Sequence, residues 1–178
     1  MPVQIGAATH PFSDPTGLLS DCHRRIETFL GTLQRVAETI DRPLTADARA
    51  ALQSSLRYFQ EAAPKHTADE EESLFPRLRN LRDAASQNAL STLAALESDH
   101  AKANALHLEV HTLGLHCLDR GPLSAVQSDR FRQAISELAS IYKAHIQVED
   151  DVVFPAAKQA LTASDKSAIA EEMAARRR

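Results

Sequence analysis

Histidine and glutamate residues at helical spacing occur twice in this sequence with the same surroundings. The first copy reads His66-Thr-Ala-Asp-Glu70-Glu-Glu-Ser-Leu-Phe-Pro76, and the second reads His145-Ile-Gln-Val-Glu149-Asp-Asp-Val-Val-Phe-Pro155. Residues four apart lie one above the other on the same face of a helix. Each copy therefore directs an imidazole and a carboxylate to the same place. Two such pairs facing each other are typical of dinuclear carboxylate centres in helical bundles.

A solvated acidic helix turn that carries a histidine by chance is the alternative for either copy taken alone. The shared Phe-Pro ending favours the metal site, because chance would not repeat the whole pattern. Imidazole and carboxylate ligands together suit iron, manganese or zinc.

The composition favours an all-α fold. Of the 178 residues 43% are apolar but only 4% are aromatic, and just five are glycine. Leu, Ala, Glu, Gln and Arg, which are good helix formers, are abundant. A chain of this length is most simply one domain, which we assign to residues 1–178.

Apolar residues at helical spacing predict four long helices and a short fifth. We expect a lead-in at residues 1–13, a bundle over about 14–160 and a C-terminal extension at 164–178. The short turns imply an antiparallel up-down-up-down four-helix bundle. The expected N-terminal helix caps are Asp14, Thr45, Ser86, Ser124 or Ser128, and Ser164-Asp165.

Two prolines lie inside the second helical pattern, which we expect to fade near residues 82–85. Pro64 removes a backbone hydrogen bond and should kink the helix just before His66. Pro76 should disturb it again. The apolar periodicity persists through both positions, so we expect one continuous helix.

Helix lengths predict that four histidines lie at one level of the bundle. The helix length from His23 to the first turn matches the length from that turn to His66 within roughly one helical turn, about 5 Å. The lengths on either side of the next two turns, which lead to His100 and then to His145, match equally well. A lone histidine on an apolar stripe is usually a satisfied core residue. Burying four of them with two carboxylates would be costly without a shared partner, which favours a site.

Charge and cysteine content exclude several classes of protein. The net charge of −4 gives no reason to expect nucleic acid. The first residues lack the pattern of a secretory signal, and no stretch is long enough to span a membrane. The two cysteines, Cys22 and Cys117, form no zinc-type motif. We therefore expect a protein of the reducing cytoplasm that does not bind membranes.

With these six residues, the chain resembles the hemerythrin HHE cation-binding family over about residues 14–158. The match consists of His23, the His66-x3-Glu70 pair, His100 and the His145-x3-Glu149 pair, in that order. The resemblance implies an antiparallel bundle around two non-haem iron ions joined by an oxo or hydroxo bridge. The four histidines would be terminal ligands, and the two glutamates would bridge the irons.

The sequence departs from the oxygen-carrying members at two positions. Asn104 stands where those carriers have a second histidine on the third helix, which leaves an open position on one iron. Their final carboxylate is an aspartate five residues after the histidine, a place that Asp150 occupies here. Glu149 fits the iron–sulfur repair branch better, although the cysteine-bearing segment common in that branch is absent. We choose Glu149 and keep Asp150 as the alternative.

The resemblance implies a di-iron protein that binds or reacts with O2, peroxide or NO, in stress response or iron handling. Whether it is an enzyme, a sensor or a carrier stays open, as does its redox partner. One alternative is an iron–sulfur repair-type protein, which would donate iron or reduce NO or peroxide. The other is a structural bundle that holds zinc.

Other polar residues are assigned more ordinary roles. His107 and His111 are read as histidines bonded across the bundle rather than as groups that support a ligand or line a path to the metal. Tyr142 is read as a core residue rather than a hydrogen-bond donor to a bound oxygen species, and Cys22 as a small core residue. The remaining acids of the repeated motif are read as a hydrated face, with Glu71 a candidate to orient a ligand: Asp69, Glu71, Glu72 and Asp151. The basic tail Arg176-Arg-Arg178 is read as a frayed, solvated terminus.

Overall fold

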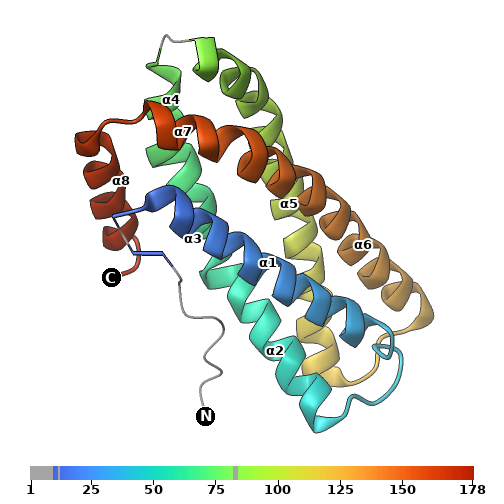
Figure 1. The fold of residues 1–178 in the computed structure, drawn as a ribbon. Coiled ribbons are helices and arrows are strands. Elements are labelled where there is room, and N and C mark those ends of the chain that lie inside the picture. The colour runs from blue at the N-terminus through green and yellow to red at the C-terminus, as the bar shows by residue number, and fades with distance from the viewer. Residues whose placement is uncertain (1–9, 12, 82–83) are drawn as a thin grey trace.

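Every regular element of the described chain is helical, as the composition predicts (Figure 1). The structure is a computed structural model, and it describes residues 10–11, 13–81 and 84–178, with the backbone alone for 84–87. The predicted lead-in therefore falls largely outside the described residues. The elements are α1 (Pro15–Ala37), α2 (Ala46–Glu61), α3 (Ala63–Ala68), η1 (Asp69–Leu74), α4 (Phe75–Arg79), α5 (Ala84–Arg120), α6 (Ala125–Val148), η2 (Glu149–Val153), α7 (Phe154–Ala160) and α8 (Ala163–Ala175).

Three predicted helix starts are confirmed by their side-chain caps. Asp14 accepts a hydrogen bond from the Gly17 amide at the start of α1, and Thr45 caps α2 in the same way. Ser124, not Ser128, caps α6 and forms a capping box with Gln127. These caps satisfy amides that have no partner within the helix.

Other helix ends differ from the prediction. Helix α5 begins at Ala84, so Ser86 lies within it rather than capping it. Helix α8 is capped by Thr162, which forms a capping box with Asp165. Helix α5 ends at Arg120, because Gly121 adopts φ +95°, a conformation that other residues rarely take.

The second helical run is interrupted where the sequence predicts a kink. Helix α2 ends at Glu61, Ala62 has φ −100°, and Pro64 lies in the first turn of α3. A proline is tolerated there because its missing N–H would have no helical partner. The continuous helix expected here is therefore wrong in detail, and α4 ends at Arg79, before residues 82–85.

Both copies of the repeated motif contain a π-helical turn that the sequence analysis missed. The amide of Phe75 donates to the carbonyl of Glu70, and the amide of Phe154 donates to the carbonyl of Glu149. A proline follows each turn. Its ring would crowd the carbonyl four residues back in an α-helix, and a wider turn relieves this contact. The Phe-Pro ending thus explains why each glutamate of the repeated motif lies at the start of a π turn.

The long helices pack as a bundle with a polar layer inside it. Helix α1 packs against α2 and α6, and α5 packs against the same two helices (Figure 1). One buried apolar cluster includes Ile26, Phe59 and Leu138, and a second includes Leu74 and Met173. Along the chain, His23, His66 and His100 each lie between residues of one cluster and residues of the other.

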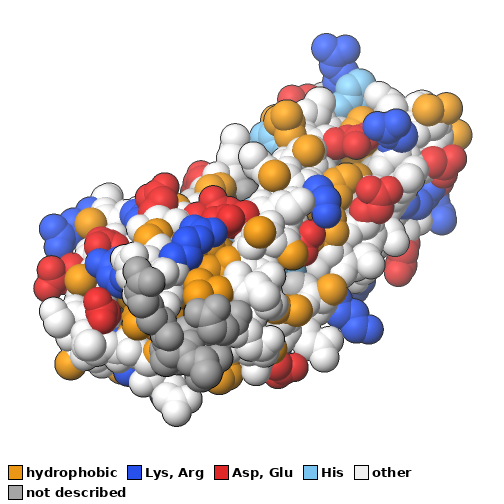
Figure 2. All heavy atoms as spheres, turned by 90° about the horizontal axis from the view of Figure 1, so that it is seen from above, with side chains coloured by type: hydrophobic (Ala, Val, Ile, Leu, Met, Phe, Trp, Pro, Cys, Tyr) orange, Lys and Arg blue, Asp and Glu red, His pale blue; other side chains and the backbone are white. Residues whose placement is uncertain are grey.

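The surface mixes charges of both signs. Lysine and arginine side chains are interspersed with aspartate and glutamate over the face in Figure 2, in keeping with the net charge of −4. No helix in the part of the chain that the structure describes has the length and apolar character to cross a membrane.

Candidate metal centre

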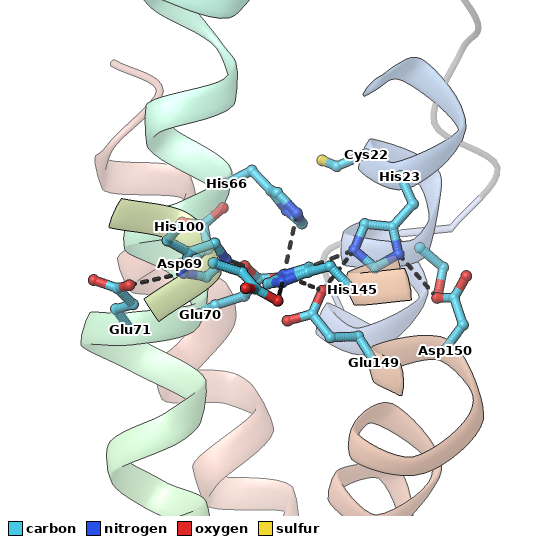
Figure 3. Close-up of polar contacts among 12 residues, drawn as sticks. Cys22, His23, His66, Asp69, Glu70, Glu71, His100, His145, Glu149 and Asp150 are labelled. Carbon is cyan, nitrogen blue, oxygen red and sulfur yellow. Dashed lines mark hydrogen bonds and ion pairs between the residues drawn. The ribbon is translucent and has the colours of Figure 1, made fainter. Parts of the chain in front are cut away.

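The structure brings all six predicted ligands together in the middle of the bundle (Figure 3). They form two overlapping groups among the described residues, and in each group the donor atoms lie within 4.8 Å of one another. Both groups contain the same two glutamates, Glu70 and Glu149. Two histidines complete each group: His23 and His66 in one, His100 and His145 in the other.

Each donor comes from a different element, and every one is buried. The π turns supply the two glutamates, whose side chains are completely buried. The α-helices supply the histidines: His23 from α1, His66 from α3, His100 from α5 and His145 from α6. The helices that build the site therefore shield most of its donor atoms from bulk water.

The repeated motif produces the same local geometry twice. The distance from His66 Nε2 to Glu70 Oε1 is 3.2 Å, and that from His145 Nε2 to Glu149 Oε2 is also 3.2 Å. Each glutamate also approaches a histidine of the other half of the chain. His100 Nε2 lies 3.3 Å from Glu70 Oε2, so Glu70 directs one oxygen towards each group. This is the orientation that a bridging carboxylate needs.

The donor atoms that face the centre lack ordinary hydrogen-bond partners. Both carboxylate oxygens of Glu70 and of Glu149, with Nε2 of His23 and of His145, are buried without one among the described residues. Leaving buried charged oxygens unpaired is costly, and a cation between them would remove that cost. The donor set therefore fits a metal ion in each group, with oxygen and nitrogen ligands.

Electrostatics keep Glu70 charged without metal. Burial raises the pKa of Glu70, but the charge of His66 and the nearby imidazoles of His100 and His23 hold it well below its usual range. Burial lowers the pKa of His100, but the nearby carboxylate of Glu70 raises it to about 9. A metal ion must therefore displace protons from histidine when it binds.

Asp150 lies beside the centre, but outside both groups. Its Oδ1 is 3.0 Å from His23 Nδ1, the ring nitrogen that faces away from the donors, and accepts from the Ser20 hydroxyl. Its other oxygen accepts from Arg24 at 2.7 Å. Such a carboxylate orients the imidazole and fixes which nitrogen is free for a metal. The geometry thus places Glu149 among the donors. Asp150 lies outside them, where it supports His23.

Two more acids support histidines from outside. Glu71 Oε1 lies 2.7 Å from His100 Nδ1, which is the orienting role considered for Glu71 from the sequence. Asp99 Oδ2 lies 3.8 Å from His145 Nδ1. Asp99 could not be predicted from the sequence, because the contact joins α5 to α6 and no local spacing signals it.

Two predictions about the acidic face and the tail are wrong. Asp69 is completely buried rather than hydrated, and it pairs with Arg176 and Arg177. The tail that carries these arginines is therefore fixed to the bundle rather than solvated. Periodicity placed Asp69 off the apolar stripe, and it gave no sign of partners more than a hundred residues away. Glu72 and Asp151 are exposed, as expected.

The cysteines belong to neither group. Cys22 and Cys117 are buried free thiols, in agreement with the core role predicted for Cys22. Burial raises the pKa of Cys22, but the nearby His66 and Arg25 lower it to about 7.

A cavity of about 390 Å³ opens next to one group of donors. Its lining includes His100, Asn104 and Phe59, and it reaches the pair formed by His107 and Tyr142. The Tyr142 hydroxyl lies 3.0 Å from His107 Nε2, a bond across the bundle of the kind predicted for His107. Burial raises the pKa of Tyr142, so its hydroxyl keeps its proton near neutral pH.

We expect His107 to make the stability of the protein depend on pH. Burial lowers its pKa to about 4 in the folded protein, from 6.5 in the unfolded chain. Between these values only the unfolded chain binds the proton. The free energy of unfolding should therefore be unaffected by His107 above pH 6.5 and decrease as the pH falls towards 4, by up to about 3 kcal/mol.

Urea unfolding of the wild type and of His107→Gln measures this contribution. Glutamine keeps a hydrogen-bonding group near Tyr142 but does not titrate. The variant should gain stability relative to the wild type as the pH decreases from about 6.5 to 4.5. A difference that stays constant over this range would contradict the prediction.

Comparison with known proteins agrees with the geometry. An uncharacterized protein of Haemophilus influenzae is 24% identical over 167 residues, which cover 93% of this chain and 91% of that protein. The hemerythrin HHE cation-binding domain matches residues 14–157, a range that contains all six donors. Since this match covers most of the sequence, the chain belongs to the hemerythrin HHE cation-binding family.

Proposed function

We propose that the protein binds two iron ions and uses them to bind or transform O2, peroxide or NO. The observation that carries this proposal is the pair of donor groups that share Glu70 and Glu149. Two shared carboxylates balance the charge of two neighbouring cations, which four neutral histidines cannot do. We also propose the alternating helix directions that the family's four-helix bundle implies.

The donor chemistry supports iron among the possible metals. Imidazole and carboxylate donors suit iron, manganese and zinc, whereas a site for softer metals would use thiolates. When bound, iron would supply redox chemistry and an open coordination position for a small ligand. Glu70 and Glu149 would bridge the ions, and the four histidines would be terminal ligands.

The cavity beside His100 is the proposed path for the small molecule. Asn104 lines it where oxygen carriers of the family have a further histidine. An amide there would leave a coordination position open on a bound iron. Tyr142, held by His107, presents a protonated hydroxyl that can donate a hydrogen bond. His107 stays neutral at physiological pH, because burial lowers its pKa to about 4.

A repair-type role is the second candidate, and the position of Asp150 favours it. Asp150 is engaged by His23, Ser20 and Arg24, which leaves Glu149, four residues after His145, as the bridging carboxylate. The iron–sulfur repair branch has the same spacing. In that role the protein would donate iron or reduce NO or peroxide in a reducing cytoplasm, where its thiols stay free.

Metal analysis of native, untagged protein tests the proposal. After growth in ample iron we expect about two irons per chain and near-ultraviolet bands typical of a dinuclear ferric centre. Adding NO or peroxide should then change the spectrum. A stable and reversible change would favour binding, and decay to product under turnover would favour an enzyme. Zinc alone, or no metal at all, would refute the redox function.

A further inference from the structure

Helix α8 lies outside the residues that match the family, yet it is part of the packed structure. Ile169 and Met173 on this helix are completely buried in the same apolar cluster as Leu74 of η1. Arg77 of α4 forms two hydrogen bonds with Glu172 of α8, at 2.8 and 3.1 Å. Figure 1 shows α8 alongside the helical run that carries α3 and α4. The end of α8 is therefore held at a defined place.

That place is the π turn that carries Glu70. Arg176 donates to Asp69 Oδ1 at 3.0 Å and to the Ser73 hydroxyl at 2.9 Å, and it also pairs with Glu72. Arg177 donates to the other oxygen of Asp69. The two arginines thus contact residues at the start, middle and end of one turn.

Asp69 links these arginine contacts to the donor residue Glu70. Its side chain is completely buried, and the arginine side chains are only 19% and 31% exposed. A buried carboxylate that loses its partners must move towards water, because an uncompensated charge is costly in the interior. Asp69 adjoins Glu70 in the chain (Figure 3). Such a movement would turn the Glu70 carboxylate away from the other donors of the two groups.

The geometry points to Arg176 and Arg177 as positioning residues of the metal centre, which hold Glu70 in place through Asp69. This inference rests on the proposed metal binding. It adds that α8 controls how tightly the metal is retained, although no residue of α8 belongs to either donor group. Removing both arginines should speed metal release, as loss of outer partners weakens metal binding by about 10–100-fold.

The test compares the full-length Arg176→Gln/Arg177→Gln variant with Arg178→Gln, which removes one charge from an exposed neighbouring position. Circular dichroism first establishes that each variant is helical. Iron transfer to an excess of a colorimetric chelator then measures release. We expect about 10–100-fold faster release from the double variant than from the wild type, and wild-type behaviour from Arg178→Gln. Equal release rates in all three proteins would overturn the inference while leaving the metal centre intact.

Asp69→Asn provides the coupled control. It should speed release by itself, and combining it with the arginine substitutions should add little, because all three residues form one interaction. Fully additive effects would mean that the arginines act elsewhere.

Hydrogen exchange separates this inference from the proposed function. In metal-stripped protein, the amides of Asp69–Leu74 should exchange at least about 10-fold faster in the double arginine variant than in Arg178→Gln, because the turn has lost its support. Unchanged exchange would overturn the positioning role whatever metal the protein binds. Faster exchange in a protein that never binds metal would instead refute the proposed function alone.

Discussion

Glu149→Gln is expected to reduce bound metal from about two ions per chain to one or none. The substitution keeps the size of the side chain but removes a charge that both donor groups share. Four buried histidines would then face two cations with one bridging carboxylate, which leaves the charge poorly balanced. Metal content per chain after iron reconstitution and gel filtration measures the effect.

Asp150→Asn and Asp151→Asn are the matched controls from the same acidic motif. Asp150 orients His23 from outside the donor groups, so its loss should weaken metal binding by about 10–100-fold without removing a bridging ligand. Asp151 is exposed, and its substitution should have no effect. If Asp150→Asn lost both ions while Glu149→Gln kept them, Asp150 would be the bridging carboxylate.

Removing the metal is expected to lower the midpoint of thermal unfolding, Tm, by about 10 °C. A ligand that binds only the folded state stabilises it by about 4 kcal/mol when its free concentration is about 1,000 times Kd. For a chain of this size each kcal/mol corresponds to about 2–4 °C. The effect should be large here because the glutamate oxygens that face the centre are buried without hydrogen-bond partners.

Thermal unfolding with and without a strong chelator measures this shift. A His66→Ala/His145→Ala variant loses one ligand from each donor group, so its Tm should be low already and should not respond to the chelator. An equal Tm for loaded and stripped wild-type protein would show that the metal does not stabilise the fold.

Local chemistry explains which helix boundaries could be predicted from the sequence. Asp14, Thr45 and Ser124 begin helices because their side chains accept bonds from amides two or three residues ahead, an interaction confined to one turn. Ser86 has the same chemistry but lies inside α5. A residue type suited to capping does not by itself end the helical conformation before it.

The donor residues could be found because polar groups on apolar stripes are unusual. His23 and His100 stand where the periodicity calls for core residues, and the structure brings them to the same buried layer. The contacts of Asp69 and Asp99 could not be found in this way. Each lies off the stripe, where periodicity indicates solvent, and its partners come from elements distant in sequence.

Each half of the chain contributes a glutamate to the donor group of the other half, which has a consequence for how the site is assembled. The first half supplies His23, His66 and Glu70 to one donor group, but the fourth ligand, Glu149, comes from the second half. The second half depends on Glu70 in the same way. Under the proposed function, neither half of the chain alone can complete an ion site. A complete site exists only once the two halves have packed together, and each bound ion then ties together segments that are far apart along the chain.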